Sequence, residues 1–492
     1  MQMKKLVASL IAALLVAFAG FTINAQAQSV EGKYIVYYEN HASINPDRIM
    51  ELGGEVLHAY KHLPALLVQL SDPQLNKIKF DESVKHVEAD EEIRRYTPIQ
   101  SLDGRLSQGI NQTIPWGVRK VRAQSSWRNY TGKGVKVAVL DSGISLRHED
   151  VTVSGGVSFV AGTSSYADDH NHGTHVAGII GAKNNHTGVV GVAPDAELYA
   201  VKVIDRNNSF LTSDLIKGID WSITNEMDIL NMSLYTYDYY NHYGLHEIIK
   251  TAYNEGMLLV GITGNTGTDS RDNTVNYPGK YSEVIAVGSI DEDSLVSYYS
   301  SFGSETEVTA PGSYVYSTLK NGSYGYMSGT SMAAPHVAGL LALLKEEYPN
   351  YTNRQLRSKL IQNSIDMGTL GRDPYYGHGL VQANVAEAHY KTWPAKKNIP
   401  QDKVWKIKFN HAVDTASVND ATVYITSGYG YRMPTVANLA KDENGKNTIV
   451  EVWTYDLFEL GGTYTLWIED LRNADGKYLK ENVKMEFTIS DM

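Results

Sequence analysis

The stretch Val135-Lys-Val-Ala-Val-Leu-Asp141-Ser-Gly143 decides the fold class of this chain. It has the pattern of a short apolar strand that ends in a carboxylate and a turn-forming glycine. Similar apolar segments follow at 198–203, 228–232, 257–261 and 284–288, separated by stretches of helical periodicity. Buried strands that alternate with helices indicate a parallel α/β sheet. Such sheets carry their sites at the carboxyl ends of strands, where Asp141 lies, although a turn-forming aspartate is the simpler interpretation of that residue alone.

This α/β region covers residues 112–390, and the regions on either side of it have different sequence patterns. Residues 28–96 mix strand-like and helix-like patterns, which predicts a small α+β domain. Residues 97–111 are polar and contain proline and glycine, as in an exposed linker that proteases cut. Residues 395–492 form short alternating strands with turns between them, which predicts a β-sandwich. The expected fold class is therefore a parallel-sheet α/β domain between a small α+β domain and a β-sandwich.

The composition and the N-terminus narrow the class of protein. The net charge of −11 argues against a nucleic-acid-binding protein, which would present a basic face. Cysteine is absent, so stability depends on packing or bound ions rather than on disulfides. Residues 1–27 combine a basic start, an apolar run and Ala25-Gln26-Ala27, the pattern of a secretory signal peptide. A membrane anchor is the alternative, but the run is shorter than the ~20 residues that a spanning helix needs.

Two further segments carry side chains suited to nucleophilic catalysis. His170-Asn-His172-Gly-Thr-His175 leads into an apolar, helix-like stretch, where a histidine can serve as a general base. The same spacing also fits a hydrolase metal site, and surface or packing histidines are a third interpretation. Gly329-Thr-Ser331 opens a long apolar helix, whose free N–H groups favour negative charge. Simple N-capping by Ser331 is the alternative there.

A fourth segment places Gly264-Asn265 directly after an apolar strand. An amide side chain at this position could donate to an oxyanion, although an asparagine in such a glycine-rich segment usually marks a turn. Each segment is ambiguous by itself. The order of Asp141, His172, Asn265 and Ser331 along one chain is what favours a catalytic interpretation.

At these positions the chain resembles the subtilisin family of serine proteases, whose triad follows the order Asp, His, Ser. The matching segments are VAVLDSGI, HGTHVAGIIGAKNNHTGVVGVAP, NMSL, GNTG, NYPGKY and GTSMAAPHVAG. The resemblance implies a monomeric serine endopeptidase that cleaves proteins or peptides through an acyl-enzyme. Ser331 would be the nucleophile, His172 the base and Asp141 the group that orients the imidazole. Asn265 would bind the oxyanion together with the backbone N–H of Ser331, and the Tyr277-Pro278 bond would be cis.

The resemblance also implies calcium in a structural role. The family's tight site corresponds here to one carboxylate, two side-chain amides and three backbone carbonyls, from Asp150, Gln112, Asn185, Lys183, Thr187 and Val189. All-oxygen ligation suits Ca²⁺, whereas a solvated loop is the alternative for each residue alone. A second, weaker cation site would involve Gly279, Tyr281, Val284 and Glu307.

The flanking regions have their own resemblances. Residues 28–96 resemble the family's inhibitory propeptide, which acts as an intramolecular chaperone and then inhibits its own protease. The mature chain would begin between Tyr96 and Gln112. Residues 395–492 resemble Ig-like modules of bacterial S-layer and cell-surface proteins, which bind an envelope or substrate surface or act as spacers. We therefore expect a secreted precursor, with cell-wall association as one option.

The substrate wall departs from the family. Ser233-Leu234-Tyr235-Thr236 stands where the family often has Ser-Leu-Gly-Gly, and Gly264 is expected to contribute to the same cleft. Tyrosine adds bulk and a hydroxyl where glycine would let the substrate approach. This predicts a reshaped cleft whose preferred residue is left open; the alternative is that Tyr235 points away.

Overall fold

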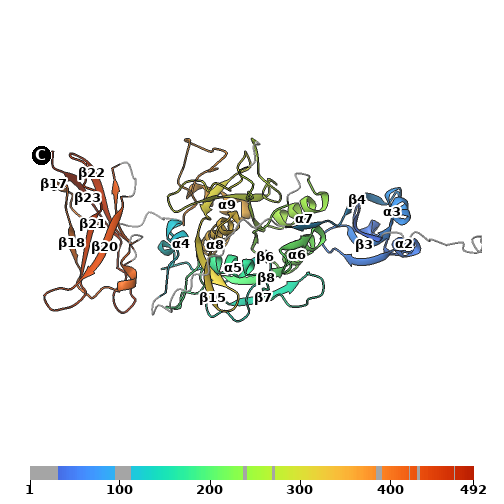
Figure 1. The fold of residues 1–492 in the computed structure, drawn as a ribbon, viewed down its shortest axis with the longest axis horizontal. Coiled ribbons are helices and arrows are strands. Elements are labelled where there is room, and N and C mark those ends of the chain that lie inside the picture. The colour runs from blue at the N-terminus through green and yellow to red at the C-terminus, as the bar shows by residue number, and fades with distance from the viewer. Residues whose placement is uncertain are drawn as a thin grey trace, which may run out of the picture. The chain divides into compact units, whose positions relative to one another are not determined.

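A computed structural model describes residues 31–94, 112–236, 241–268, 272–383, 391–419, 422–428, 433–469 and 471–491. The predicted signal peptide and processing linker lie outside these ranges. The described chain divides into two compact units, of which one comprises 31–60 and 64–90. The other comprises 61–63 and the chain from 91 onward. Figure 1 traces the elements of both units.

The smaller unit is an antiparallel sheet covered by two short helices. Its strand order is β2 (Glu55–Ala59), β3 (Ala65–Ser71), β1 (Glu31–Tyr38), β4 (Val84–Ala89). Helices α2 (Pro46–Glu51) and α3 (Asp72–Lys79) place Ile49, Leu75 and Ile78 against the core of that sheet. This is the α+β arrangement that the sequence predicted.

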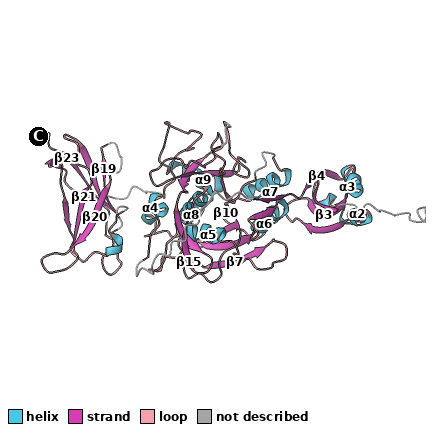
Figure 2. Ribbon diagram, in the orientation of Figure 1, coloured by secondary structure: helices cyan, strands magenta, loops and turns pink. Residues whose placement is uncertain are grey.

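The larger unit is built on a seven-stranded sheet in which every pair is parallel. The order is β13 (Val308–Pro311), β12 (Val284–Ile290), β11 (Leu258–Ile262), β10 (Ile229–Met232), β6 (Lys136–Asp141), β8 (Glu197–Lys202), β7 (Val153–Ser158). The chain continues from β6 to one side and later returns to β10 on the other. This makes β6 a switch point of the sheet, where ligand sites of open α/β sheets form. The predicted fold class is confirmed (Figure 2).

Helices cover both faces of the sheet. Val137 and Val139 of β6 share one core with α5 (His172–Gly181) and α8 (Thr330–Glu347). Leu140 points to the other face, because successive strand residues alternate. There Gly218 of α6 (Thr212–Thr224) lies against Leu140 and Val201, and α6 packs on α7 (Tyr243–Asn254). Helices α4 (Trp116–Lys120) and α9 (Asn353–Gln362), with the hairpin β14 (Val315–Leu319) and β15 (Ser323–Met327), complete this region.

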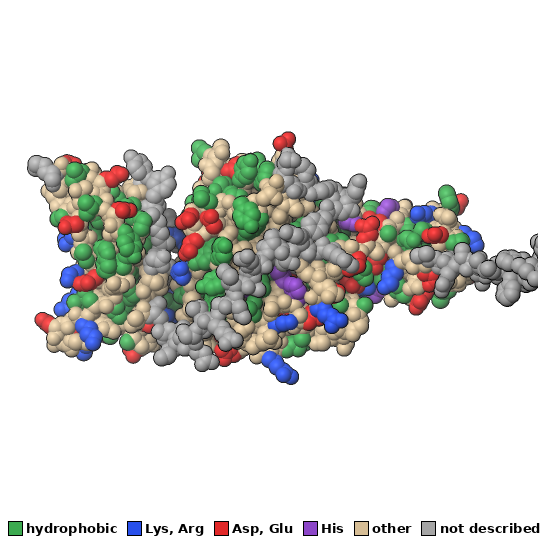
Figure 3. All heavy atoms as spheres, viewed as in Figure 1, with side chains coloured by type: hydrophobic (Ala, Val, Ile, Leu, Met, Phe, Trp, Pro, Cys, Tyr) green, Lys and Arg blue, Asp and Glu red, His purple; other side chains and the backbone are tan. Residues whose placement is uncertain are grey.

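The C-terminal region consists of two small, mainly antiparallel sheets. One contains β16 (Lys391–Thr392), β17 (Lys396–Ile399), β23 (Val483–Ile489), β22 (Thr463–Ile468) and β19 (Val423–Ser427). The other contains β18 (Trp405–Lys408), β21 (Ile449–Thr454) and β20 (Thr435–Ala440). Buried side chains from both sheets form one core, which is the pattern of a sandwich. Acidic and basic side chains are interspersed on the face seen in Figure 3.

Candidate active site

Asp141 and His172 meet at the carboxyl end of β6. Asp141 is the last residue of that strand and is fully buried. His172 is the first residue of α5, after Asn171 in the left-handed conformation at φ 98°. Both carboxylate oxygens of Asp141 lie 2.8 Å from His172 Nδ1. This geometry fixes the proton on Nδ1 and leaves Nε2 as the basic nitrogen.

A second aspartate, which no sequence motif singled out, holds this pair in place. Asp168 Oδ2 accepts hydrogen bonds from the Thr174 amide at 3.0 Å and its hydroxyl at 2.5 Å. Its Oδ1 accepts from the Ser142 hydroxyl at 2.9 Å, and that hydroxyl accepts from the Gly173 amide at 3.0 Å. The strand end and the helix start are thereby linked on both sides of the Asp141–His172 bond.

Lys202 is another residue that the sequence patterns did not single out. It is 1% exposed, and its Nζ donates to the Ser142 carbonyl at 2.7 Å and to Asp169 at 2.6 Å. A buried ammonium is costly unless it is paired, so these contacts account for its position. The available signal was a single charge at the end of the apolar stretch 198–203.

Ser331 lies in the first turn of α8, directly after Gly329 and Thr330. Gly329 has φ 153°, a conformation that favours glycine. The Ser331 hydroxyl lies 3.3 Å from the Ser233 carbonyl, and the Ser233 hydroxyl donates to the Ser331 carbonyl at 2.9 Å. Ser233 follows β10, the neighbour of β6, so the sheet brings Ser331 to the edge that carries Asp141.

The Asn265 side chain lies beside Gly329 and the start of α8. Its Oδ1 accepts from the Thr330 amide at 2.9 Å and from the Thr330 hydroxyl at 2.8 Å, which fixes the other end of the side chain. A Cβ built on Gly329 would lie 3.5 Å from Asn265 Nδ2 and 3.7 Å from the Ser331 nitrogen. Two N–H donors therefore border one space, and the absence of a side chain at Gly329 keeps it open.

The residues of the predicted substrate wall are buried in the structure. Ser233, Leu234 and Tyr235 are all nearly fully buried, and Tyr235 belongs to the main core cluster. The effect of Tyr235 on the cleft stays a prediction. Gly264 has φ 115° and lies against Asn276, so its backbone conformation requires glycine. The Tyr277-Pro278 peptide bond is cis, as predicted.

The histidines of the alternative metal site do not converge. His175 Nε2 lies 3.1 Å from the carbonyl oxygens of Val315 and Gly325, so it donates into the β14–β15 hairpin. Burial lowers the pKa of His175 to about 3, which keeps the ring neutral. Among the described residues, no three His, Cys, Asp or Glu side chains are grouped to hold a metal ion.

The predicted calcium residues do converge, and they form a cage of oxygens. Gln112 Nε2 lies 2.6, 3.0 and 2.8 Å from the carbonyls of Lys183, Thr187 and Val189, and 3.3 Å from Asn185 Oδ1. An amide nitrogen has only two protons, so four acceptors around it exceed its hydrogen-bonding capacity. A cation in this cage would use all four oxygens, with the Gln112 amide turned to present Oε1.

Asp150 supplies the negative charge beside that cage. Its Oδ1 accepts from Asn185 Nδ2 at 2.8 Å, and its Oδ2 accepts from the Val189 amide and the Tyr324 hydroxyl, both at 2.8 Å. Burial, followed by the hydrogen bond to Asp150, raises the pKa of Tyr324, so the phenol stays a donor. The residues present fit a calcium ion.

At the predicted second cation site, an arginine side chain contacts two of the four predicted ligands. The guanidinium of Arg357 forms a bidentate ion pair with Glu307 and lies 3.3 Å from the Val284 carbonyl. A permanent positive charge thus occupies two of the four predicted ligands. Gly279 and Tyr281 lie in the preceding turn, where Tyr281 is buried and stacks on His246.

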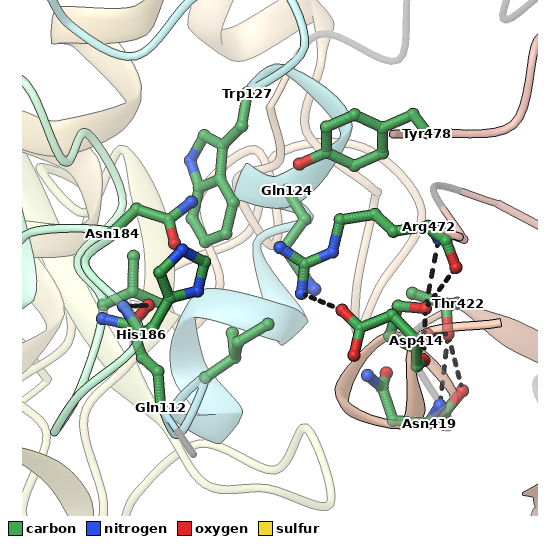
Figure 4. Close-up of a pocket in the computed structure, with 13 residues that line it drawn as sticks. Gln112, Gln124, Trp127, Asn184, His186, Asp414, Asn419, Thr422, Arg472 and Tyr478 are labelled. Atoms are coloured by element: carbon green, nitrogen blue, oxygen red, sulfur yellow. Dashed lines mark hydrogen bonds and ion pairs between the residues drawn. The ribbon is translucent and has the colours of Figure 1, made fainter. Parts of the chain in front are cut away.

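A separate pocket of about 120 Å³ is lined by none of the predicted catalytic side chains (Figure 4). Its lining combines Gln112, Trp127 and His186 with Arg472 and Tyr478 of the C-terminal region. None of its lining residues belongs to the Asp141–His172–Ser331 constellation. It is therefore not the substrate cleft.

Residues 132–379 match the sequence profile of the subtilase family, Peptidase_S8. The chain belongs to the subtilase family. It is 42% identical over 388 residues to the minor extracellular protease Epr of Bacillus subtilis, covering 77% of this chain and 58% of that protein's length. It is 40% identical over 398 residues to subtilisin E of Bacillus subtilis, covering 78% of this chain and 100% of that protein. A thermostable alkaline protease of Halalkalibacterium halodurans is 40% identical over 368 residues, 74% of this chain and 95% of that protein.

Proposed function

We propose that this subtilase hydrolyses peptide bonds of proteins through a triad of Ser331, His172 and Asp141. The observation that carries the proposal is the 2.8 Å contact between Asp141 and His172 Nδ1 at the strand end that faces the start of α8. Ser331 Oγ attacks the carbonyl carbon while its proton passes to His172 Nε2. The imidazolium, stabilised by Asp141, then protonates the leaving amine, and water releases the acyl group by the same route. The donors at Asn265 and Ser331 bind the oxyanion of each tetrahedral intermediate.

Active-site labelling tests this assignment. A serine-directed fluorophosphonate should modify Ser331 stoichiometrically and abolish casein hydrolysis in proportion to labelling. Peptide mass spectrometry locates the adduct. Ser358, an exposed serine on α9 whose hydroxyl donates to the Arg354 carbonyl, should stay unlabelled. An enzyme that remains fully active after complete modification of Ser331 would refute the triad.

We further infer that the chain is made as a secreted precursor that processes itself, with residues 1–27 as signal peptide and 28–96 as propeptide. Two segments of that region support this role from within the larger unit. Strand β5 (Glu92–Arg94) pairs antiparallel with β9 (Ser209–Leu211), as a bound peptide would. The amides of Lys61 and His62 donate to the Asp220 carboxylate at 3.1 and 2.7 Å.

Secretion followed by N-terminal sequencing tests the precursor. The wild-type chain should appear with an N-terminus between Tyr96 and Gln112, whereas Ser331→Ala should accumulate with residues 28–96 attached. Equal processing of both chains would assign the cleavage to another protease. An extracellular location agrees with the relative described as a minor extracellular protease. Among the described residues, no helix is long and apolar enough to cross a bilayer.

Calcium in this proposal is structural. Gln112, Asp150, Lys183, Asn185, Thr187 and Val189 would hold it, supported by the oxygen cage described above. The ion would tie the segment at Gln112 to the 183–189 loop and lower the free energy of the folded state. Residues 395–492 are proposed as an Ig-like domain that holds the protease near an envelope or substrate surface, and the protease as a monomer.

A further inference from the structure

A second pocket, of about 460 Å³, lies entirely within the C-terminal region. Its inner part is apolar: Trp393, Phe409 and Leu479 line it and pack against the sandwich core. Four exposed lysines line it as well, at Lys391, Lys408, Lys477 and Lys480. Glu481 is the one acidic residue among the described lining residues. A basic pocket in a chain of net charge −11 departs from the composition of the rest of the molecule.

The backbone that carries these lysines is well fixed. The 473–477 turn closes with the Asn473 amide donating to the Lys477 carbonyl and the Lys477 amide donating to Asn473 Oδ1, both at 2.8 Å. The Leu479 amide donates to the Leu471 carbonyl at 2.8 Å, and the Lys391 amide donates to the Asn482 carbonyl at 2.9 Å. The ammonium groups are therefore attached to a preorganised rim.

The charges available in the pocket are ammonium groups rather than guanidinium groups. Arg472 also lines the pocket, but its guanidinium pairs with Asp414 at 3.0 Å (Figure 4). Within the described residues, no carboxylate lies within ion-pair distance of Lys391, Lys477 or Lys480. Guanidinium pairs bidentately with carboxylate and phosphate alike, whereas an ammonium group binds either anion as a point charge and sets no fixed geometry. Exposed ammonium groups around an aromatic floor fit repeated phosphates joined by short carbon units.

We propose that this pocket binds an anionic polymer of the polyol phosphate type and thereby localises the enzyme on a phosphate-bearing surface. The inference deepens the proposed role of the C-terminal domain and does not depend on the protease mechanism. Polymer phosphates contact the lysine rim, and the carbon units of the polymer lie against Trp393 and Phe409. An acidic peptide is the competing ligand, because it offers the same charge on carboxylates.

Binding is measured by calorimetry on the full chain carrying Ser331→Ala, which prevents self-digestion. The probe is synthetic poly(glycerol phosphate) at low salt and at 0.5 M NaCl, with poly-L-glutamate of equal charge number for comparison. We expect the phosphate polymer to bind more tightly and the affinity to fall with salt. The double variant K477A/K480A should bind about tenfold more weakly, which corresponds to about 1.4 kcal/mol.

The matched control is K441A/K446A, which removes two exposed lysines of the β20–β21 turn outside the pocket. It should change the affinity less than twofold, and Lys391→Ala provides an independent third pocket variant. Hydrolysis of a short peptide by the corresponding variants with Ser331 intact should be unchanged, which separates this inference from the triad. Equal losses in the pocket and control pairs, or no binding at low salt, would overturn the site. Tighter binding of polyglutamate, lost in K477A/K480A, would replace the phosphate polymer with an acidic peptide.

Discussion

The Asp141–His172–Ser331 region and the oxygen cage lie near opposite ends of α5 and differ in what completes them. At the end of β6, Asp141 and His172 satisfy one another, and a hydroxyl and two N–H donors border the remaining space. At the 183–189 loop, oxygens surround a single amide nitrogen of Gln112. The first site is complete with its own side chains, whereas the second has more acceptors than donors. Changes to the first should therefore alter turnover, and changes to the second should alter stability.

The largest effect is expected from Ser331→Ala. Loss of the nucleophile should lower kcat by about 10⁶ while the melting temperature with calcium changes little. This magnitude is the one established for subtilisin itself, and it applies to this chain through its membership of the family. Casein hydrolysis under initial-rate conditions measures it, with Ser358→Ala as the control. A residual rate near that of the wild type would show that turnover does not depend on this site. It would contradict the distinction between a site for turnover and a site for stability.

Asn265→Ala should have the second-largest effect, a loss of about 10²–10³ in kcat with a small change in KM. The range is again that of subtilisin, because the donor acts on charge that develops in the transition state. Thr330→Val is the informative control. It removes only one of the two bonds that orient Asn265 and should cost less than tenfold. If KM rose while kcat stayed constant, Asn265 would contact the ground state rather than the oxyanion.

The residues in these predictions show how much of the candidate site could be predicted from the sequence. Asp141, His172, Asn265 and Ser331 could be selected because their order along the chain and the motifs around them match one family, and each borders an apolar strand or helix pattern. No apolar run marks the short strand β2, because Glu55–Ala59 alternates exposed and half-buried residues. Asp168 and Lys202 were not singled out, because the contacts that join them to Ser142 and Thr174 depend on tertiary structure that no local pattern specifies. The burial of Tyr235 in the core could not be predicted either, because it is a tertiary property.

Calcium removal tests the oxygen cage, where we expect an effect on stability rather than on turnover. With Ser331→Ala as background, excess chelator should lower the free energy of unfolding by roughly 3–4 kcal/mol if the ion is supplied at 100 to 1,000 times its dissociation constant. Thermal unfolding with and without calcium measures this. Asp150→Asn should abolish most of the calcium dependence, because it removes the carboxylate beside the cage. Glu149→Gln changes the adjacent exposed carboxylate and should retain the dependence. An unchanged dependence in Asp150→Asn would place the ion elsewhere.

The smallest effect is a change of stability with pH. It contrasts the histidine of the proposed active site with histidines that are buried in the fold. His172 takes up a proton in the proposed reaction, whereas His175 and His336 are buried in the fold. Burial lowers their pKa values to about 3 and about 4. His336 Nδ1 donates to the Met332 carbonyl at 2.8 Å, while its buried Nε2 has no hydrogen-bond partner among the residues that the structure describes. Because the folded-state pKa lies below the unfolded value of about 6.5, the unfolded chain binds these protons first.

The stability contributed by each buried histidine is therefore complete above about pH 6.5 and is lost as the pH falls toward 4. The loss per histidine should be somewhat below 1 kcal/mol between pH 7 and 6 and should approach about 1.4 kcal/mol per unit below that. Denaturant unfolding of Ser331→Ala at several pH values measures the slope. His336→Asn preserves a donor toward Met332 and removes one titrating ring. Its unfolding should therefore take up one proton fewer, and stability should fall less steeply with pH. His411→Asn, at an exposed position, should leave the slope unchanged. If His336→Asn kept the full dependence of stability on pH, protonation of carboxylates rather than of His336 would account for the loss of stability in acid.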